Sequence, residues 1–192
     1  MKSQWMIYGA NGYSAQLAIE KAVEQGKTPI LAGRNQAQIE ALGKKFDLPV
    51  RIFDLSSIDE VAEQLADVIV VSHCAGPFSA TAEPMMKACI KAGTHYTDIT
   101  GEGPVFRITQ SFHEQAKKAG VVLMSGAGFD VIPTDCLANF LHQQLPDATD
   151  LVLGFDGNMA LSPGTSKTMM ENLHMGMAVR RKGEMKFVGR GI

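Results

Sequence analysis

Short apolar runs alternate with amphipathic stretches from the start of the chain to about residue 126. This alternation is typical of βαβ units, in which helices join parallel strands, and it disfavours a β-sandwich or a helical bundle. The six predicted strands cover residues 4–9, 28–33, 50–55, 67–75, 94–100 and 121–126. The five predicted helices between them cover residues 13–25, 35–46, 58–65, 81–92 and 105–119. We therefore expect a doubly wound α/β fold with a parallel sheet.

The fourth predicted strand is the most apolar, since residues 68–71 read VIVV. Such a strand fits the centre of a sheet that helices cover on both faces. Right-handed crossovers then favour the strand order 3-2-1-4-5-6, with the switch point between the first and fourth strands. Ligands of open α/β sheets bind outside the carboxyl ends of the strands at that point.

The pattern changes after residue 126. The predicted elements there are a helix at 133–144, a strand at 151–157, a helix at 165–175 and a hairpin at 179–188 that turns at Lys182 and Gly183. The segment that holds these elements is too short to form a core of its own. We therefore expect one domain at residues 1–148 and, at residues 149–192, the beginning of a truncated mixed α/β domain.

A glycine motif, G-A-N-G-Y-S-A, follows the first predicted strand directly. Gly9 permits a tight turn, Gly12 leaves room for a pyrophosphate, and Ala15 allows close packing of helix on strand. The phosphates would then lie at a helix N-terminus, where free N–H groups favour an anion. The alternative is an ordinary strand-to-helix turn, but the position in the repeat predicts a Rossmann-type dinucleotide site. The predicted contacts are Gly9, Ala10, Asn11, Gly12, Tyr13, Ser14 and Ala15.

The residues at the end of the second strand usually distinguish an NAD site from an NADP site. An NAD site usually carries an acidic residue there for the ribose 2′-OH, whereas NADP needs a cation for its 2′-phosphate. This chain has Arg34 and Asn35 and no acid. The guanidinium fork suits a phosphate, and Asn35 also suits the cap of the next helix. We therefore predict NADP rather than NAD, with a solvated loop arginine as the alternative.

Two further strand ends complete the predicted coenzyme site. Asp54 and Leu55 end the third strand and are predicted to contact the adenine, although Asp54 is equally suited to cap a turn. After the fourth strand comes Ala75-Gly76-Pro77-Phe78, predicted to contact the nicotinamide half. Gly76 permits close backbone approach and Pro77 fixes the turn, so a stiff connection without a ligand is the alternative.

Composition excludes several other classes of protein. The formal net charge is −2 and the basic residues are scattered, which argues against a nucleic-acid partner. Cys74, Cys89 and Cys136 form no metal-ligand spacing, and their odd number favours a reducing, cytoplasmic location without a structural metal. No run of about 18 apolar residues occurs, so no membrane span is expected.

Five motifs in order carry a family resemblance: G-A-N-G-Y, A-G-R-N, A-G-P-F, H-Y-T-D-I-T-G-E and G-F-D-V-I-P-T-D. Together they resemble the saccharopine dehydrogenase-like family, in particular its branch of trans-acting enoyl reductases. The resemblance implies an NAD(P)-dependent oxidoreductase with a Rossmann domain followed by a substrate and dimerisation domain. It also implies a full-length protein about twice as long as this chain, which forms a homodimer. Asn11 stands where threonine is usual, and Ala15 replaces the third glycine.

The predicted reaction is hydride transfer between NADP(H) and a small-molecule imine, enoyl or carbonyl substrate. The nicotinamide transfers the hydride, so the protein must position the substrate and move a proton. We favour Glu102 and Asp130, at the ends of the fifth and sixth strands, although a cap or structural hydrogen bond suits each equally. His73 fits a core histidine. A non-catalytic NADP-binding sensor or partner subunit is the alternative function.

Overall fold

The computed structural model describes residues 2–154, 166, 170, 177–181 and 184–188. It divides the chain into two compact units, Met1–Asp156 and Gly157–Ile192. The predicted domain boundary between residues 148 and 149 stays a prediction. The first unit holds the sheet and the candidate site.

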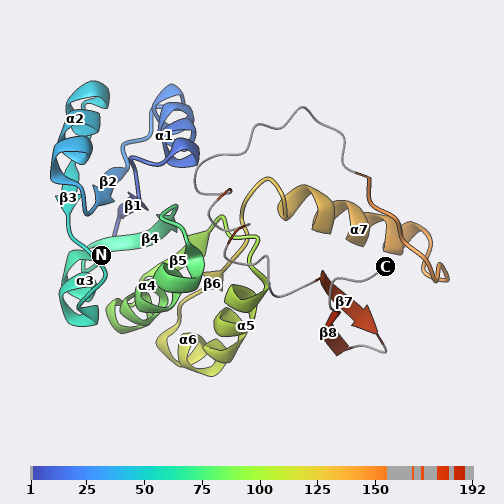
Figure 1. Cartoon of the computed structure of the whole chain (residues 1–192). Helices are drawn as coiled ribbons and strands as arrows, with labels where there is room; N and C mark the ends of the chain where they lie inside the picture. Colours follow the sequence, from blue (N-terminus) through green and yellow to red (C-terminus); the bar gives the residue numbers. More distant parts are fainter. Residues whose placement is uncertain (1, 155–165, 167–169, 171–176, 182–183, 189–192) are drawn as a thin grey trace. The chain divides into compact units, whose positions relative to one another are not determined.

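A six-stranded parallel sheet forms the centre of the first unit (Figure 1). Its strands follow the order β3-β2-β1-β4-β5-β6, which confirms the predicted topology and its switch point between β1 and β4. The register places Met6 opposite Ile30 of β2 and opposite Val71 of β4. The strand bounds are β1 (Gln4–Tyr8), β2 (Ile30–Gly33), β3 (Val50–Ile52), β4 (Val68–His73), β5 (His95–Asp98) and β6 (Leu123–Met124).

Helices cover both faces of the sheet, with α1 and α2 on one side and α3 to α6 on the other (Figure 1). Neighbouring strand residues point to opposite faces, so Met6 joins the core under α3, α4 and α5 while Ile7 joins the core under α1 and α2. Burying one such side chain contributes roughly 1.5–3 kcal/mol. The helix bounds are α1 (Tyr13–Glu24), α2 (Gln36–Phe46), α3 (Ile58–Gln64), α4 (Phe78–Ala92), α5 (Gly103–Ser111), α6 (His113–Ala119) and α7 (Ile132–Gln144).

Two local predictions were wrong. The helix predicted at 105–119 is two helices, because Phe112 leaves the helical path and buries its ring in the core. Of the strand predicted at 151–157, residues 151–154 form no strand, since they pair with no other described residue and Val152 is 90% exposed, and residues 155–157 lie outside the described residues. The predicted central place of β4 is confirmed, although Ile69 of this strand is 42% exposed.

In the second unit, β7 (Met177–Arg181) and β8 (Glu184–Val188) pair antiparallel. The pairing of Arg181 with Glu184 confirms the predicted hairpin, and its turn at Lys182 and Gly183 lies outside the described residues. Of the helix predicted at 165–175, Ser166 and Met170 are helical and the remaining positions lie outside the described residues.

Candidate coenzyme-binding site

The glycine loop joins β1 to α1 and packs directly against the end of β4. Gly9 has a φ of +79°, and its N–H and that of Ala10 both donate to the carbonyl of Ala32, at 2.8 and 3.1 Å. A Cβ at Gly9 would lie 2.8 Å from the Cβ of Ala75. Glycine is therefore required at position 9 both by backbone conformation and by this contact.

The N-terminus of α1 is open for an anion. Gly12 is its N-cap, no side chain caps the helix, and its first turn contains no acidic residue. Ala15 is fully buried beneath the loop, whereas Tyr13 is 67% exposed. A Cβ at Gly12 would lie 3.2 Å from the carbonyl oxygen of Gly9. The arrangement fits a pyrophosphate on the unpaired N–H groups of the helix end.

Exposed polar side chains surround the end of β2. Arg34 makes neither a hydrogen bond nor a salt bridge with any described residue, so its guanidinium is available to a ligand. Asn35 caps α2 as predicted, because its side chain accepts a hydrogen bond from the N–H of Gln38 at 3.1 Å. The amide of Asn11 donates to Oε1 of Gln38 at 2.8 Å.

Gln38 is therefore a polar neighbour of the glycine loop that the motif search missed. A signal for it exists, because Asn35 followed three residues later by Gln38 matches the capping-box pattern. In that pattern the glutamine bonds back to its own cap residue. Here the side chain reaches Asn11 instead, which the pattern alone does not indicate.

At the end of β3, Asp54 caps a turn, which was one of its two predicted roles. Its carboxylate accepts hydrogen bonds from the N–H and hydroxyl of Ser56, and these bonds, with a smaller contribution from the charge of Arg34, hold its pKa below the usual value. Asp54 is exposed and Leu55 is half-buried against the core. Nearby, burial raises the pKa of Tyr8 to about 12, and its hydroxyl donates to the carbonyl of Phe53.

The segment Ala75-Gly76-Pro77-Phe78 links β4 to α4, with a cis peptide bond between Gly76 and Pro77. The hydroxyl of Thr81 lies 2.6 Å from the carbonyl oxygen of Ala75 and 3.0 Å from Nε2 of His73. His73 is fully buried, as expected of a core histidine, and burial lowers its pKa to about 3. Its Nδ1 has no hydrogen-bond partner among the described residues.

Glu102 lies at the carboxyl edge of β5, where the strand pattern placed it, but its carboxylate turns inward. Oε1 accepts a hydrogen bond from the N–H of Phe78 at 3.0 Å, and Oε2 accepts one from Ser79 at 2.9 Å. The residue is only 6% exposed. The structure thus brings Glu102 to the beginning of α4.

Asp98 is a second buried carboxylate, at the end of β5, and it is fully enclosed. Oδ2 accepts from the hydroxyls of Tyr96 at 2.6 Å and Ser125 at 3.0 Å. Oδ1 accepts from the N–H groups of Thr100 at 3.0 Å and Gly126 at 2.8 Å. Asp98 therefore joins the ends of β5 and β6.

Asp130, the other predicted catalytic candidate, is exposed and lies beside the loop after β5. A Cβ at Gly101 would lie 2.5 Å from its Oδ2, which shows how closely the carboxylate packs on that glycine. Glu102 and Asp130 therefore flank the same glycine, but only Asp130 is exposed to solvent.

Other site chemistries find no support in the part of the chain that the structure describes. No three His, Cys, Asp or Glu side chains gather there to hold a metal ion. Cys74, Cys89 and Cys136 are all free, and burial raises the pKa of the Cys74 thiol to about 11. No described helix is both long and apolar enough to cross a membrane.

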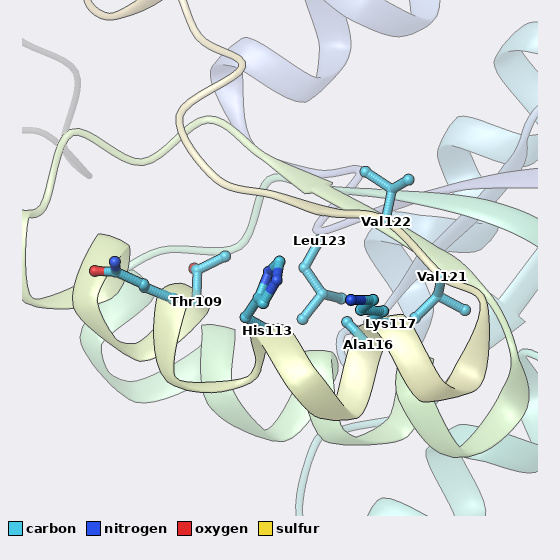
Figure 2. Close-up of a pocket in the computed structure, with 8 residues that line it drawn as sticks. Thr109, His113, Ala116, Lys117, Val121, Val122 and Leu123 are labelled. Atoms are coloured by element: carbon cyan, nitrogen blue, oxygen red, sulfur yellow. The ribbon is translucent and has the colours of Figure 1, made fainter.

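One surface hollow of about 310 Å³ lies elsewhere, between α5, α6 and residues 121–123 (Figure 2). Its lining includes His113 and Lys117 of α6 and Leu123 of β6. Residues 121 and 122 precede β6, so the hollow lies at the amino end of that strand. It is therefore separate from the carboxyl edge that holds the glycine loop.

Solved structures share the fold. Saccharopine dehydrogenase (L-Glu forming) from Saccharomyces cerevisiae aligns with a TM-score of 0.65 at 22% identity, covering 76% of this chain and 32% of the yeast chain. Triphenylmethane reductase from Citrobacter sp., complexed with NADP(H), aligns with a TM-score of 0.51 at 16% identity, covering 64% of this chain and 48% of the other. At these identities the similarity shows the fold alone.

Curated relatives are closer in sequence. The trans-acting enoyl reductase of Mycobacterium bovis is 30% identical over 86% of this chain and 43% of its own length. The saccharopine dehydrogenase-like oxidoreductase of Pongo abelii is 30% identical over 68% of this chain and 35% of its own length. The chain thus spans less than half the length of either relative.

The model of one protein family, the saccharopine dehydrogenase NADP-binding domain, matches residues 5–124. The match begins in β1 and ends with β6, so it covers the whole parallel sheet. It confirms the resemblance stated above, and it confirms NADP as the coenzyme expected from the end of β2. By this match, the chain belongs to the family of saccharopine dehydrogenase NADP-binding domains.

Proposed function

We propose that this chain is the coenzyme domain of an NADP-dependent oxidoreductase. It binds NADP along the carboxyl ends of β1 to β4, and the whole protein transfers hydride between NADP(H) and a small-molecule imine, enoyl or carbonyl substrate. The observation that carries the proposal is the open N-terminus of α1 beside the contact between Gly9 and Ala75. This contact keeps side chains away from the switch point, where the pyrophosphate belongs.

The residues around the glycine loop fit the two ends of the coenzyme. The exposed guanidinium of Arg34 suits the 2′-phosphate, and Asn11 and Asn35 supply further polar groups beside it. On the other side, the exposed backbone of Gly76 suits the nicotinamide half. Bound NADPH supplies the hydride, so the chain itself has only to bind and orient the coenzyme and move a proton.

For the proton, Asp130 is the better placed of the two candidates. Its carboxylate is exposed beside Gly101 at the carboxyl edge of the sheet, whereas both oxygens of Glu102 accept backbone hydrogen bonds. We propose Asp130 as the acidic side chain that faces the substrate.

A titration of the full chain with NADPH and with NADH tests the coenzyme assignment. We expect NADPH to bind at least tenfold more tightly, which corresponds to about 1.4 kcal/mol. Arg34→Ala removes the guanidinium and is expected to weaken NADPH tenfold or more while leaving NADH within about twofold. Isothermal titration calorimetry gives both affinities.

Lys44→Ala is the matched control. It removes one exposed positive charge from the opposite end of α2, so the affinity for NADPH should stay within about twofold of the original value. If Arg34→Ala lowered the affinities for NADPH and NADH equally, the argument that Arg34 binds the 2′-phosphate would fail. Absence of binding of either coenzyme to the unaltered chain would overturn the proposed function.

A further inference from the structure

Glu102 belongs to the loop after β5, yet its carboxylate lies at the first turn of a different helix, α4. The two oxygens accept hydrogen bonds from consecutive N–H groups, those of Phe78 at 3.0 Å and Ser79 at 2.9 Å. The N–H of Glu102 itself donates to the hydroxyl of Thr100 at 3.0 Å, which fixes the loop from which the side chain extends.

Helix α4 lacks a cap of its own. Its N-cap residue is Pro77, which carries no side-chain acceptor, and no acidic residue occurs in its first turn. The first N–H groups of a helix have no partner within the helix, and a carboxylate beside them is favoured by the positive end of the helix dipole. Glu102 therefore supplies from a neighbouring loop the cap that Pro77 cannot provide.

This cap fixes one end of the segment 75–78. At the other end, Ala75 packs on Gly9, and its carbonyl oxygen lies 2.6 Å from the hydroxyl of Thr81. Phe78 is only 8% exposed, whereas Gly76 between the two fixed ends is exposed. The segment thus presents a backbone surface whose two ends are both held by contacts with other parts of the fold.

We propose that Glu102 is a positioning residue that holds the segment 75–78 in the shape that receives the nicotinamide half of NADP. The inference rests on the proposed function and gives Glu102 a task other than proton transfer, since both oxygens already accept N–H bonds. It also explains why the N-termini of α4 and α1 differ. The end of α4 is closed by a negative charge, and the end of α1 remains open for the pyrophosphate.

The test compares two ligands on the full chain. NADPH contains both halves of the coenzyme, whereas adenosine 2′,5′-bisphosphate carries the adenine and the 2′-phosphate without a nicotinamide. Glu102→Gln removes the charge and turns one N–H acceptor into a donor. We expect this variant to lower the affinity for NADPH at least fivefold and to shift the fluorescence emission of bound NADPH. The affinity for adenosine 2′,5′-bisphosphate should stay within twofold of the original value.

Glu83→Gln is the matched control. Glu83 lies on the same helix but is 45% exposed and pairs with Lys87, so its replacement should change neither affinity nor emission. Equal weakening of both ligands in Glu102→Gln, or no change in either, would overturn the positioning role. Binding of neither ligand to the unaltered chain would instead refute the proposed function, so the two failures are distinguishable.

Glu102→Asp covers the case in which Glu102→Gln does not fold. It keeps the carboxylate but shortens the side chain by one methylene. We therefore expect a smaller loss of affinity for NADPH and no loss of affinity for adenosine 2′,5′-bisphosphate. Loss of cooperative thermal unfolding in both variants would assign Glu102 to stability alone and overturn the inference.

Discussion

The carboxyl edge of the sheet, where the coenzyme is proposed to bind, has two halves that are stabilised in different ways. The glycine-loop half, residues 9–15 and 33–38, is fixed by backbone bonds such as that from Gly9 to Ala32, and its polar side chains are exposed. The carboxylate half, residues 73–81, 98–102 and 125–128, is fixed by the buried side chains of Asp98 and Glu102. The first half depends on residues being small, and the second on acidic groups being enclosed.

The largest expected effect is in the carboxylate half. Asp98→Ala should lower the free energy of unfolding by about 4 kcal/mol, because four donors lose their acceptor in the interior. Urea denaturation followed by circular dichroism measures the loss. Asp59→Ala is the control, since Asp59 is 75% exposed and pairs with Lys91, and it should cost less than about 1 kcal/mol. Similar losses in the two variants would show that enclosure of Asp98 contributes little.

In the glycine-loop half, Gly9→Ala should cost about 3 kcal/mol. The added methyl group meets Ala75, and alanine is strained at a φ of +79°. Gly26→Ala separates these two causes, because Gly26 has a φ of +68° and its Cβ would meet no atom within 4 Å. We expect that variant to lose about 1 kcal/mol, from strain alone. Equal losses in the same urea titration would mean that the contact with Ala75 is relaxed without cost.

The smallest of the three effects concerns pH. His73 has a folded pKa of about 3 against an ordinary value of 6.5, because burial disfavours its charged form. As pH falls through 6.5 the unfolded chain takes up a proton that the folded protein does not, so stability is greatest above this pH and declines below it. The loss from pH 7 to pH 5 should be about 2 kcal/mol.

Substitution of His73 isolates that contribution. His73→Leu should remove most of the difference in unfolding free energy between pH 7 and pH 5, whatever its effect on stability at either pH. Asp54 and Asp67 do not interfere, because their pKa values lie below the usual carboxyl value and they stay charged in this window. His113→Gln, at a side chain that is 72% exposed, should keep the original difference. A pH dependence that survives in His73→Leu would point to another group.

The glycine-loop half was largely predictable from sequence because its signals are local. The glycine pattern and the cap at Asn35 both follow from residues close together in the chain. Even there, the bond between Asn11 and Gln38 joins two motifs that no spacing rule connects. Whether these residues bind NADP stays a proposal.

The carboxylate half was not predictable in the same way. The predicted strand at 94–100 contains Asp98 and ends just before Glu102, but the partners of these two side chains lie up to 28 residues away along the chain. An acidic residue at a strand end has the same sequence signature whether it turns toward solvent or inward. The break at Phe112 has a similar origin, since the burial of one ring in the core outweighs the helical periodicity on either side.

The contact between Gly9 and Ala75 also limits the size of the side chains at two positions that are far apart in the sequence. A side chain larger than alanine at position 75 would reach into the loop after β1, and any Cβ at position 9 would reach into the segment after β4. In related chains that keep this fold, position 9 should therefore stay glycine and position 75 should stay small. The end of β1 and the end of β4 therefore share one steric constraint, although they lie far apart in the sequence.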